Sequence, residues 1–299
     1  MDVSVILVNY NTLELTRKAI ESIYKHTGGV DFEVILVDNA STDGSKDYFR
    51  GRKDIIYIYN ETNVGFGKAN NIGYRYAKGK YIFLLNTDTY LLNNAIKCFF
   101  DYMEKAPADI ACAGCWLKNM ELEDNQSEVH FLSISTVLKN SMKAFVPSFV
   151  RRRGQNQSGN EKSDEKQVEA VIGADMFVRR DVIEKWGLFD ENIFMYCEEI
   201  DVQKRWTDAG YKMMLISSPS IVHLEGQSSN RYSAKRNIMF TKGVFYYLKK
   251  HNPAWKYQIF RVLYAILKLP FFLNRHYTFH DRCMIIRNIF TFIPHTSKH

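Results

Sequence analysis

The chain has 299 residues, of which 46% are hydrophobic, and it carries a formal net charge of +7 at pH 7. This length and apolar content exclude a disordered protein and supply the core of one large domain with an appended part. No apolar run reaches the roughly 18 residues of a membrane span, and no charged leader precedes the first apolar run, so we expect a cytoplasmic protein.

The positive charge is concentrated near the C-terminus. Residues 231–299 hold 13 Lys and Arg against one acid, a net charge of +12, whereas residues 1–230 hold 27 against 32, a net charge of −5. Such an asymmetry indicates an anionic partner for the C-terminal region, either a membrane or a nucleic acid.

Strands and helices are predicted to alternate over the first 115 residues, because β-branched runs bounded by polar turns are followed by segments with apolar residues at helical spacing. The predicted strands are Val3–Asn9, Phe32–Asp38, Ile55–Tyr59, the run from Tyr81 that ends at Asp88, and Asp109–Cys115. Helices are expected after Asn11, which can act as a cap with Glu14 three residues later, in NVGFGKANNIG, and over Asn93–Glu104. This alternation predicts an α/β fold with a mostly parallel sheet flanked by helices.

Five scattered cysteines suit reduced thiols better than a disulfide framework. Cys112 and Cys115 form a C-x-x-C pair inside the apolar stretch DIACAGCW, with no second Cys or His pair nearby. We expect a buried strand there rather than a zinc or redox site.

The composition of the sequence changes near Asn119. Val129–Val150 is apolar but irregular, and Arg151–Gln167 is polar, so we predict an insertion or flexible loop over residues 119–168. A strand, a short helix and a second helix that closes at Gly210 are expected to follow.

Glycine-rich phosphate loops are missing from the places where they would be needed. After the first strand the chain reads NYNTLEL, Gly65-Phe66-Gly67 is followed by Asn70 where a third Gly would stand, and no GKS or GKT occurs. A dinucleotide-binding Rossmann loop and a P-loop are therefore excluded.

The most informative stretch is YIFLLNTDTY, residues 81–90, in which an apolar run stops abruptly at Asn86-Thr87-Asp88. Open α/β sheets bind ligands at the carboxyl ends of their strands, so Asp88 is a candidate metal ligand. Turn chemistry alone also places Asp and Asn at strand ends, and the tripeptide does not decide between the two.

Seven motifs in register resemble the inverting glycosyltransferases of family 2, which have the GT-A fold, and especially their rhamnosyltransferase-like branch. They run from Val3 to about Ser228 and read VSVILVNYN, EVILVDNASTDGS, NVGFGKANNIG, FLLNTD, GADMFVRRDVIEKWGLFDE, YCEEIDVQKRWTDAGY and VHLEGQSS. The resemblance implies a GT-A-type, Rossmann-like domain over residues 1–228. Its nucleotide-binding half would be 1–118 and its acceptor half 169–228, with a basic helical region over 229–299.

The implied reaction is the transfer of a sugar (rhamnose-like, hexose or N-acetylhexosamine) from a UDP- or dTDP-sugar to a glycan acceptor in bacterial surface polysaccharide synthesis. A departing nucleoside diphosphate develops negative charge that Mn²⁺ or Mg²⁺ can stabilise. The family's Asp-x-Asp motif carries Asn86 in place of its first acid here, so Asp88 is the expected carboxylate ligand, while Asn86 and Thr87 would orient the donor. His223 matches the position of a second ligand, which would favour Mn²⁺; a structural hydrogen bond is its alternative role.

The motifs also assign residues to the nucleotide. Asp38 resembles the acceptor for the N3–H of uracil or thymine, although it could also cap the following turn. The other positions implied to bind the donor are Asn9, Tyr10, Asn11, Asn39, Gly65 and Lys68, of which Lys68 could equally be a solvated surface lysine.

An acceptor hydroxyl must lose a proton as it attacks the anomeric carbon, and the family places the base in a Glu-Asp pair at a helix start. Here the pair reads Glu198-Glu199. We expect Glu199 to be the base, with Glu198 as the alternative. Asp175, Trp186 and Asp201 stand at positions implied to lie near the donor sugar or acceptor, although the spacing of Asp201 and Arg205 also predicts a structural ion pair.

From Trp255 to Phe292 the chain mixes apolar and basic residues, with Pro270 breaking the first helix. Basic amphipathic helices of this type lie on anionic membranes, so we expect peripheral association with the cytoplasmic face of the inner membrane, close to a lipid-linked glycan acceptor. Packing on the catalytic domain or on the second subunit of a homodimer is the alternative, and no nucleic-acid-binding motif is present.

Two functions of other classes stay open. The family usually has Asp at the position of Glu199, so a catalytically silent sugar-nucleotide or glycan-binding module is one alternative. A nucleotidyltransferase would need a Gly-rich basic loop near the N-terminus, and the chain has Asn9-Tyr10-Asn11-Thr12 instead.

Overall fold

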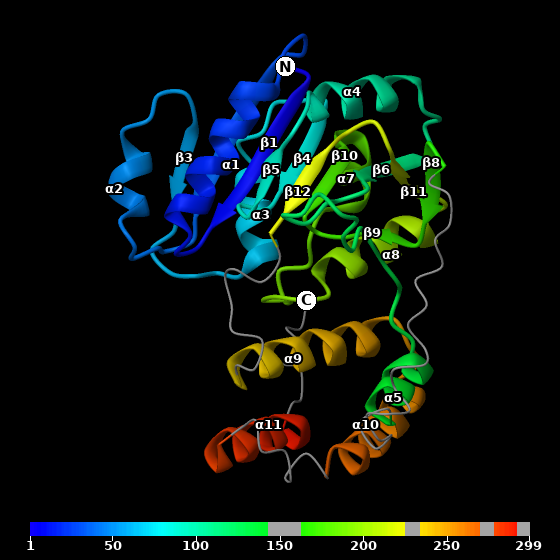
Figure 1. The fold of residues 1–299 in the computed structure, drawn as a ribbon. Coiled ribbons are helices and arrows are strands. Elements are labelled where there is room, and N and C mark those ends of the chain that lie inside the picture. The colour runs from blue at the N-terminus through cyan, green and yellow to red at the C-terminus, as the bar shows by residue number, and fades with distance from the viewer. Residues whose placement is uncertain (143–162, 225–233, 270–277, 292–299) are drawn as a thin grey trace. The chain divides into compact units, whose positions relative to one another are not determined.

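The computed structural model describes residues 1–142, 163–224, 234–269 and 278–291 (Figure 1). By its internal contacts the chain divides into two compact units. Unit 1 comprises Met1–Phe131 and Lys162–Ser228, and unit 2 comprises Leu132–Glu161 and Ser229–His299. Among the described residues, unit 1 holds every strand and unit 2 is helical.

An eight-stranded sheet forms the centre of unit 1, in the order β3-β2-β1-β4-β10-β6-β11-β8. Neighbours run parallel from β3 to β4 and between β6 and β11, whereas β10 and β8 run antiparallel to the strands beside them. The predicted mostly parallel sheet is thus confirmed. Its strands are β1 (Val3–Asn9), β2 (Phe32–Asp38), β3 (Ile56–Tyr59), β4 (Tyr81–Leu85), β6 (Ile110–Cys115), β8 (Glu165–Val168), β10 (Asp175–Arg179) and β11 (Lys212–Ile216).

Helices cover both faces of this sheet, which explains why its inner strands read as continuous apolar runs (Figure 1). Val5 and Leu7 of β1 share one apolar layer with Ile20 of α1, while Ile6 shares the other with Ala69 of α3. The helices of unit 1 are α1 (Leu13–His26), α2 (Ser45–Arg50), α3 (Phe66–Tyr74), α4 (Ala95–Lys105), α7 (Arg180–Trp186) and α8 (Glu198–Asp208).

Two short antiparallel ladders accompany the main sheet. One pairs β5 (Thr89–Leu91) with β12 (Ile221–His223), and the other pairs β7 (Glu128–Val129) with β9 (Ala170–Val171). The first ladder joins the segment after β4 to a strand from much later in the chain.

The expected helix cap at Asn11 is wrong. Helix α1 begins at Leu13, whose amide donates to Asp43 Oδ2 at 2.8 Å. Asn11 instead takes a left-handed φ of 55°, and its Oδ1 accepts from the amide of Thr42 at 2.7 Å. A carboxylate from the turn after β2 thus stabilises the positive end of the helix, a contact that the local pattern cannot reveal.

The C-x-x-C pair lies in a buried strand, as predicted. Cys112 and Cys115 are fully buried in β6, and burial raises the pKa of both thiols well above the usual value. Within the described ranges, no group of three or more His, Cys, Asp and Glu side chains could hold a metal ion by itself.

Part of the predicted insertion is ordered. Helix α5 (Ile134–Met142) belongs to unit 2, and Glu165–Val168 forms the edge strand β8, so the expectation of a loop at those residues is wrong. Most of the polar segment Arg151–Gln167, namely 151–162, lies outside the described residues. An edge strand needs only one partner, which is why a mostly polar sequence can form it.

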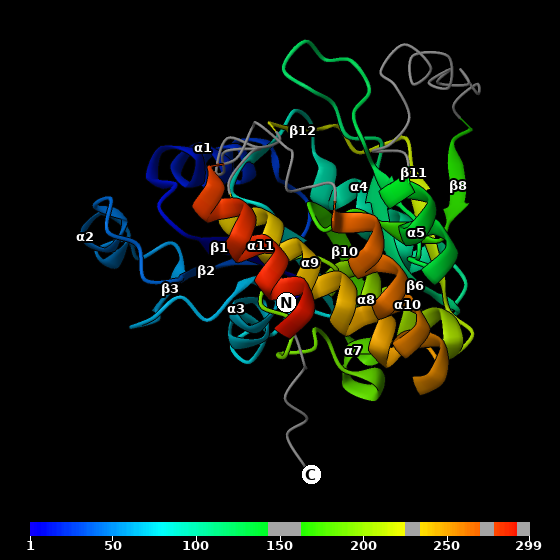
Figure 2. The same ribbon diagram turned by 90° about the horizontal axis from the view of Figure 1, so that it is seen from below.

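The helices expected in the C-terminal region are present. They are α9 (Ala234–Lys250), α10 (Ala254–Lys268) and α11 (Phe279–Thr291), and α10 ends just before Pro270, which itself is not among the described residues. Within unit 2, α11 lies beside α9 and α5 beside α10 (Figure 2). None of the helices in the described ranges is long and apolar enough to cross a membrane.

Candidate functional site

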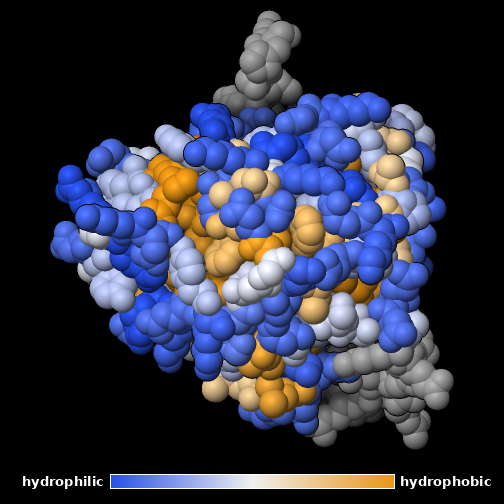
Figure 3. Space-filling model, turned by 90° about the horizontal axis from the view of Figure 1, so that it is seen from above, coloured by the Kyte–Doolittle hydropathy of each residue, from blue (hydrophilic) through white to orange (hydrophobic). Residues whose placement is uncertain are grey.

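The residues expected to bind donor and metal gather at one edge of the main sheet. Because β1, β2 and β4 are parallel, their carboxyl ends bring Asn9, Asp38 and the Asn86–Asp88 turn to the same edge, with Asn9 directly opposite Asp38. The face seen from the side where β1 begins is mainly hydrophilic, with several apolar patches (Figure 3).

Asp88 and His223 meet through the β5-β12 ladder. The ladder sets His223 opposite Thr89, and His223 Nε2 lies 3.4 Å from Asp88 Oδ1, with both side chains mostly buried. Two neighbouring ligands of an octahedral cation, each roughly 2.1 Å from the ion, stand about 3 Å apart. The pair therefore fits a divalent cation and would leave the remaining positions to phosphate oxygens and water.

Asp175 adds a buried carboxylate beside this pair. Strand β10 places Asp175 opposite Leu85, the last residue of β4, and Asp175 Oδ2 accepts from the amide of Cys115 at 2.7 Å. Its Oδ1 is buried and has no hydrogen-bond partner among the residues that the structure describes. Burial raises the pKa of this carboxyl to about 7, against the lowering effect of the Cys115 hydrogen bond. The side chain of Asp175 is completely buried, so its contact with a sugar stays a prediction.

Glu198 and Glu199 begin helix α8, after two residues with left-handed backbone, Tyr196 (φ 70°) and Cys197 (φ 72°). Strained backbone of this kind concentrates at functional sites. Glu198 is buried, and its Oε2 has no hydrogen-bond partner within the described ranges, whereas Glu199 is partly exposed. Burial raises the pKa of both carboxyls, and the charge of Glu199 raises that of Glu198 further. The more accessible Glu199 is therefore better placed to meet a substrate.

Gln203, which the sequence analysis missed, fixes the position of Glu199. Its fully buried amide accepts from the Val171 amide and donates to the Val171 carbonyl, each at 2.8 Å, and also donates to the Glu199 carbonyl at 3.0 Å. These bonds tie α8 to β9, and a Cβ on Gly173 would lie 3.4 Å from the Cβ of Glu199. The sequence could have indicated this role, because Gln203 is a polar residue one helical turn after Glu199 on the buried face of α8.

Asp38 is completely buried. Its Oδ1 accepts from the Ser41 amide at 2.8 Å, which confirms the predicted turn cap, and its Oδ2 accepts from the Tyr57 hydroxyl at 2.9 Å. Each carboxylate oxygen retains a second lone pair, so contact with a nucleobase stays a prediction.

Asn39 organises the loop after β3. Its amide nitrogen donates to Asn63 Oδ1 at 2.9 Å and to the Gly65 carbonyl at 3.3 Å, while its oxygen accepts from Asn60 Nδ2 at 3.1 Å and from the Val64 amide at 3.0 Å. Two donors and two acceptors exhaust the capacity of the amide. Asn39 thus positions the loop, and its side chain has nothing left for a nucleotide.

Asn9 has a similar role at the start of the first loop. It is fully buried, donates to Ser41 Oγ at 3.0 Å, and accepts from the hydroxyls of Thr12 and Thr16 at 2.7 and 2.9 Å. Thr12 also contacts Thr87, whose hydroxyl lies 3.2 Å away. The loop after β1 and the turn after β4 are therefore held together.

The remaining predicted donor residues differ in their surroundings. Tyr10 is 45% exposed, and its ring is available for stacking. Gly65 has φ +90°, and the Phe194 carbonyl occupies the space that a Cβ would need, which requires glycine at this contact. Lys68 lies 3.3 Å from Glu191 in an ion pair on the surface, in agreement with the surface-lysine alternative.

Two residues expected near the acceptor both contact Arg205. Asp201 is fully buried and pairs with Arg205 at 3.3 Å, which confirms the predicted ion pair and leaves no surface for a sugar. Trp186 is exposed, and its carbonyl accepts from the Arg205 side chain. A role of Trp186 at the acceptor stays a prediction.

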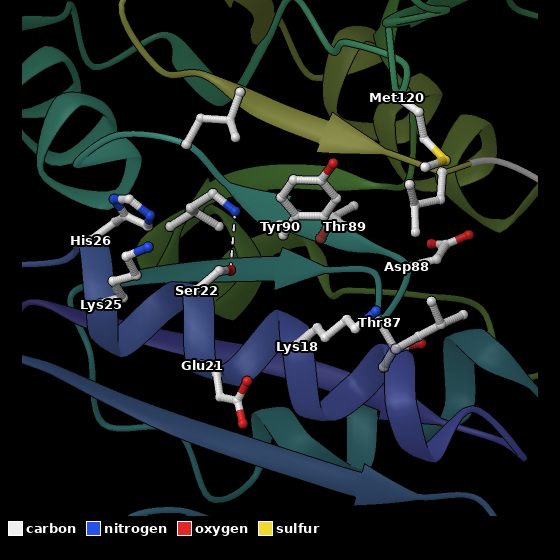
Figure 4. A pocket seen from close by; sticks show the side chains of 14 residues that line it. Lys18, Glu21, Ser22, Lys25, His26, Thr87, Asp88, Thr89, Tyr90 and Met120 are labelled. Carbon is white, nitrogen blue, oxygen red and sulfur yellow. Dashed lines mark hydrogen bonds between the residues drawn. The ribbon is translucent and has the colours of Figure 1, made fainter. Parts of the chain in front are cut away.

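An open cavity of about 490 Å³ adjoins Asp88, between α1 and β5 (Figure 4). Lys18 and Ser22 of α1, Tyr90 of β5 and Met120 contribute to its lining. Open space therefore lies next to the side chain of Asp88.

Comparison with known proteins agrees with this arrangement. The family model described as Glycosyl transferase family 2 matches residues 4–187. Rhamnosyltransferase WbbL of Escherichia coli is 23% identical over 258 residues, which cover 83% of this chain and 93% of the relative. The N-acetylglucosaminyl-diphospho-decaprenol L-rhamnosyltransferase of Mycobacterium tuberculosis is 22% identical over 237 residues, 74% of this chain and 76% of the relative. The resemblance to the rhamnosyltransferase-like branch is thereby confirmed.

Other curated relatives match over a shorter stretch, and the matched part of the chain spans only 37%, 37%, 18% and 15% of the length of four of them. Among solved structures, GalNAc-T7 with UDP, GalNAc and Mn²⁺ superposes with a TM-score of 0.60 at 14% identity, covering 93% of this chain and 58% of that one. The fold is therefore the expected GT-A type, and the chain belongs to glycosyl transferase family 2.

Proposed function

We propose that the protein is a metal-dependent, inverting glycosyltransferase that moves a sugar from a UDP- or dTDP-sugar to a glycan acceptor. The observation that carries the proposal is the Asp88–His223 pair, whose facing atoms lie 3.4 Å apart at the carboxyl edge of the sheet. The structural neighbour with UDP and Mn²⁺ supports a nucleotide-sugar donor and a divalent cation.

Asp88 and His223 would hold the cation, which supplies positive charge to the diphosphate as it leaves. Asn86 has a partly exposed side chain with no hydrogen bond to any described residue, so its amide is available to orient the donor phosphates. Tyr10 would cover the base, and the rigid Asn39-centred loop would close the nucleotide pocket.

Glu199 would accept the proton of the attacking hydroxyl, with Glu198 as the alternative. A base must be deprotonated before reaction, and two adjacent carboxyls, one of them buried, resist holding two negative charges. Glu198, the more buried of the two, would retain a proton and leave Glu199 ionised. Asp175 would lie beside the donor sugar, with its own side chain completely buried.

The acceptor proposed here is a lipid-linked glycan of bacterial surface polysaccharide synthesis. The mycobacterial relative, whose name includes a diphospho-decaprenol acceptor, supports this class. Such an acceptor lies in a membrane, and the basic region over 229–299 would bring the enzyme to the anionic cytoplasmic face.

A panel of UDP- and dTDP-sugars incubated with Mn²⁺ tests the proposal. Metal-dependent release of a nucleoside diphosphate, lost in Asp88→Ala, is the expected result. Release of pyrophosphate would instead identify a nucleotidyltransferase. Tight nucleotide binding without turnover, under conditions where a soluble acceptor analogue is present, would identify a silent binding module.

A further inference from the structure

Helix α10 has two apolar faces, one buried inside unit 2 and one exposed. Tyr257, Phe260 and Tyr264 are buried, and the last two rings lie 5.4 and 5.2 Å from the ring of Phe245 in α9. Their spacing of three and four residues is that of one helix face. This face attaches α10 to its neighbour.

The second face presents large apolar side chains to solvent, and we call it the α10 stripe. Its five members are exposed by 43–63% of their surface: Trp255 63%, Ile259 53%, Val262 61%, Leu263 43% and Ile266 56%. Four of them, at positions 255, 259, 262 and 266, recur every three or four residues, and Leu263 lies next to Val262, so the five form one continuous band along the helix. Soluble proteins rarely expose such a band unless it contacts a partner.

The surroundings of the stripe are strongly basic. Lys256 and Arg261 lie on the same helix, and the described residues of unit 2 hold 11 Lys and Arg against a single acid, Asp281. Positive charge around an apolar band complements an anionic surface into which apolar side chains can insert. Two copies of the stripe facing each other would bring like charges together, which disfavours self-association.

The length of α10 determines how it could lie. Its 15 residues span roughly 22 Å, less than the roughly 30 Å of a bilayer core, and the charges of Lys256 and Arg261 interrupt it. The helix is therefore suited to lying in the plane of the interface rather than crossing it.

We propose that the α10 stripe is the surface through which the protein binds an anionic lipid bilayer, with the stripe inserted at the level of the headgroups. The inference rests on the membrane partner proposed above, but not on sugar transfer. The sequence indicated membrane contact only for the region 229–299 as a whole, whereas this proposal assigns the contact to one face of α10.

Flotation of the full-length chain with vesicles of phosphatidylcholine and 30% phosphatidylglycerol tests the surface. The triple variant Ile259→Ser, Val262→Ser, Ile266→Ser should lower the bound fraction at least tenfold, while the matched triple change of these residues to Leu should bind as the natural chain does. Unchanged nucleotide affinity of both variants would show that unit 1 is still folded.

The depth of insertion gives an independent readout. Tryptophan fluorescence should be quenched by brominated acyl chains in the natural chain, and Trp255→Phe should abolish that quenching while the protein still floats. Equal flotation of the Ser and natural chains would overturn the proposal. So would a natural chain that fails to float and elutes as a dimer that the Ser variant dissociates, because a second copy would then be the partner.

Discussion

Asp88 Oδ1 and His223 Nε2 lie 3.4 Å apart, although the two residues are distant in the sequence. Asp88 follows β4, and His223 is the last residue of β12. The link between them is the β5-β12 ladder, which also joins the Leu224 amide to the Asp88 carbonyl at 3.0 Å. The metal site that we propose therefore depends on a contact between two distant segments, and either side chain can be removed without breaking the ladder.

Removing Asp88 should abolish metal-dependent turnover. Asp88→Ala is expected to lower kcat/KM by about 100-fold or more, since metal stabilisation of the leaving group contributes several kcal/mol. His223→Ala should cost less and shift the preference from Mn²⁺ toward Mg²⁺, because an imidazole ligand favours manganese. Steady-state kinetics with each metal measure both effects. Asp109→Asn, at the opposite edge of the sheet, is the control, and equal loss in that variant would contradict a local role.

Glu199→Gln should lower kcat by roughly 10² to 10⁴, the usual contribution of a general base, with little change in the KM for the donor. Glu198→Gln should leave most of the activity, because the amide mimics a carboxyl that we propose to be protonated. Single-turnover rates for the two isosteric variants separate the roles. A larger loss of rate in Glu198→Gln than in Glu199→Gln would identify Glu198 as the base.

The stability of the protein should fall with rising pH because of Asp175. Its pKa is raised to about 7 on folding by burial, from about 3.9 in an unfolded chain, so the folded state binds the proton more tightly. The stabilisation from this group is complete below the unfolded value and is lost as the pH rises through about 7. Urea unfolding in EDTA at pH 5 and pH 8 should therefore show a smaller decrease in Asp175→Asn than in the natural chain. An identical decrease in both proteins would refute the assignment.

Asn39→Ala should disorganise the loop after β3. Four hydrogen bonds converge on this buried amide, and leaving their partners unsatisfied costs about 1–3 kcal/mol each when the groups are buried. We expect a lower free energy of unfolding and weaker binding of UDP or dTDP, measured by chemical denaturation and calorimetry. Asn60→Ala removes only one of the four bonds and should have a smaller effect on both.

Much of the fold and part of the site could be predicted from sequence. Apolar runs that end in Asn or Asp marked the strands correctly, and the family motifs pointed to Asp88 and His223, which the structure brings together. Gln203 and the cap from Asp43 escaped prediction because each depends on a hydrogen bond to a segment far away in the chain. Asn39 had a motif assignment, but only its four bonds reveal that its amide serves the loop.

Dependence on distant segments also explains why the loop predicted at the end of the insertion was wrong. β8 is a mostly polar segment whose strand conformation comes from pairing with β11, so no local periodicity predicts a strand there. The expected role of Trp186 near the acceptor stays a prediction, and its contact with Arg205 could not be read from the motif.

Titration of Mn²⁺ in the presence of UDP, followed by electron paramagnetic resonance, tests the central claim most directly. The account predicts one tightly bound Mn²⁺ per chain, with affinity reduced at least tenfold in Asp88→Ala and measurably in His223→Ala. Binding of Mn²⁺ that is unchanged in both variants would contradict it, because the metal would then lie elsewhere.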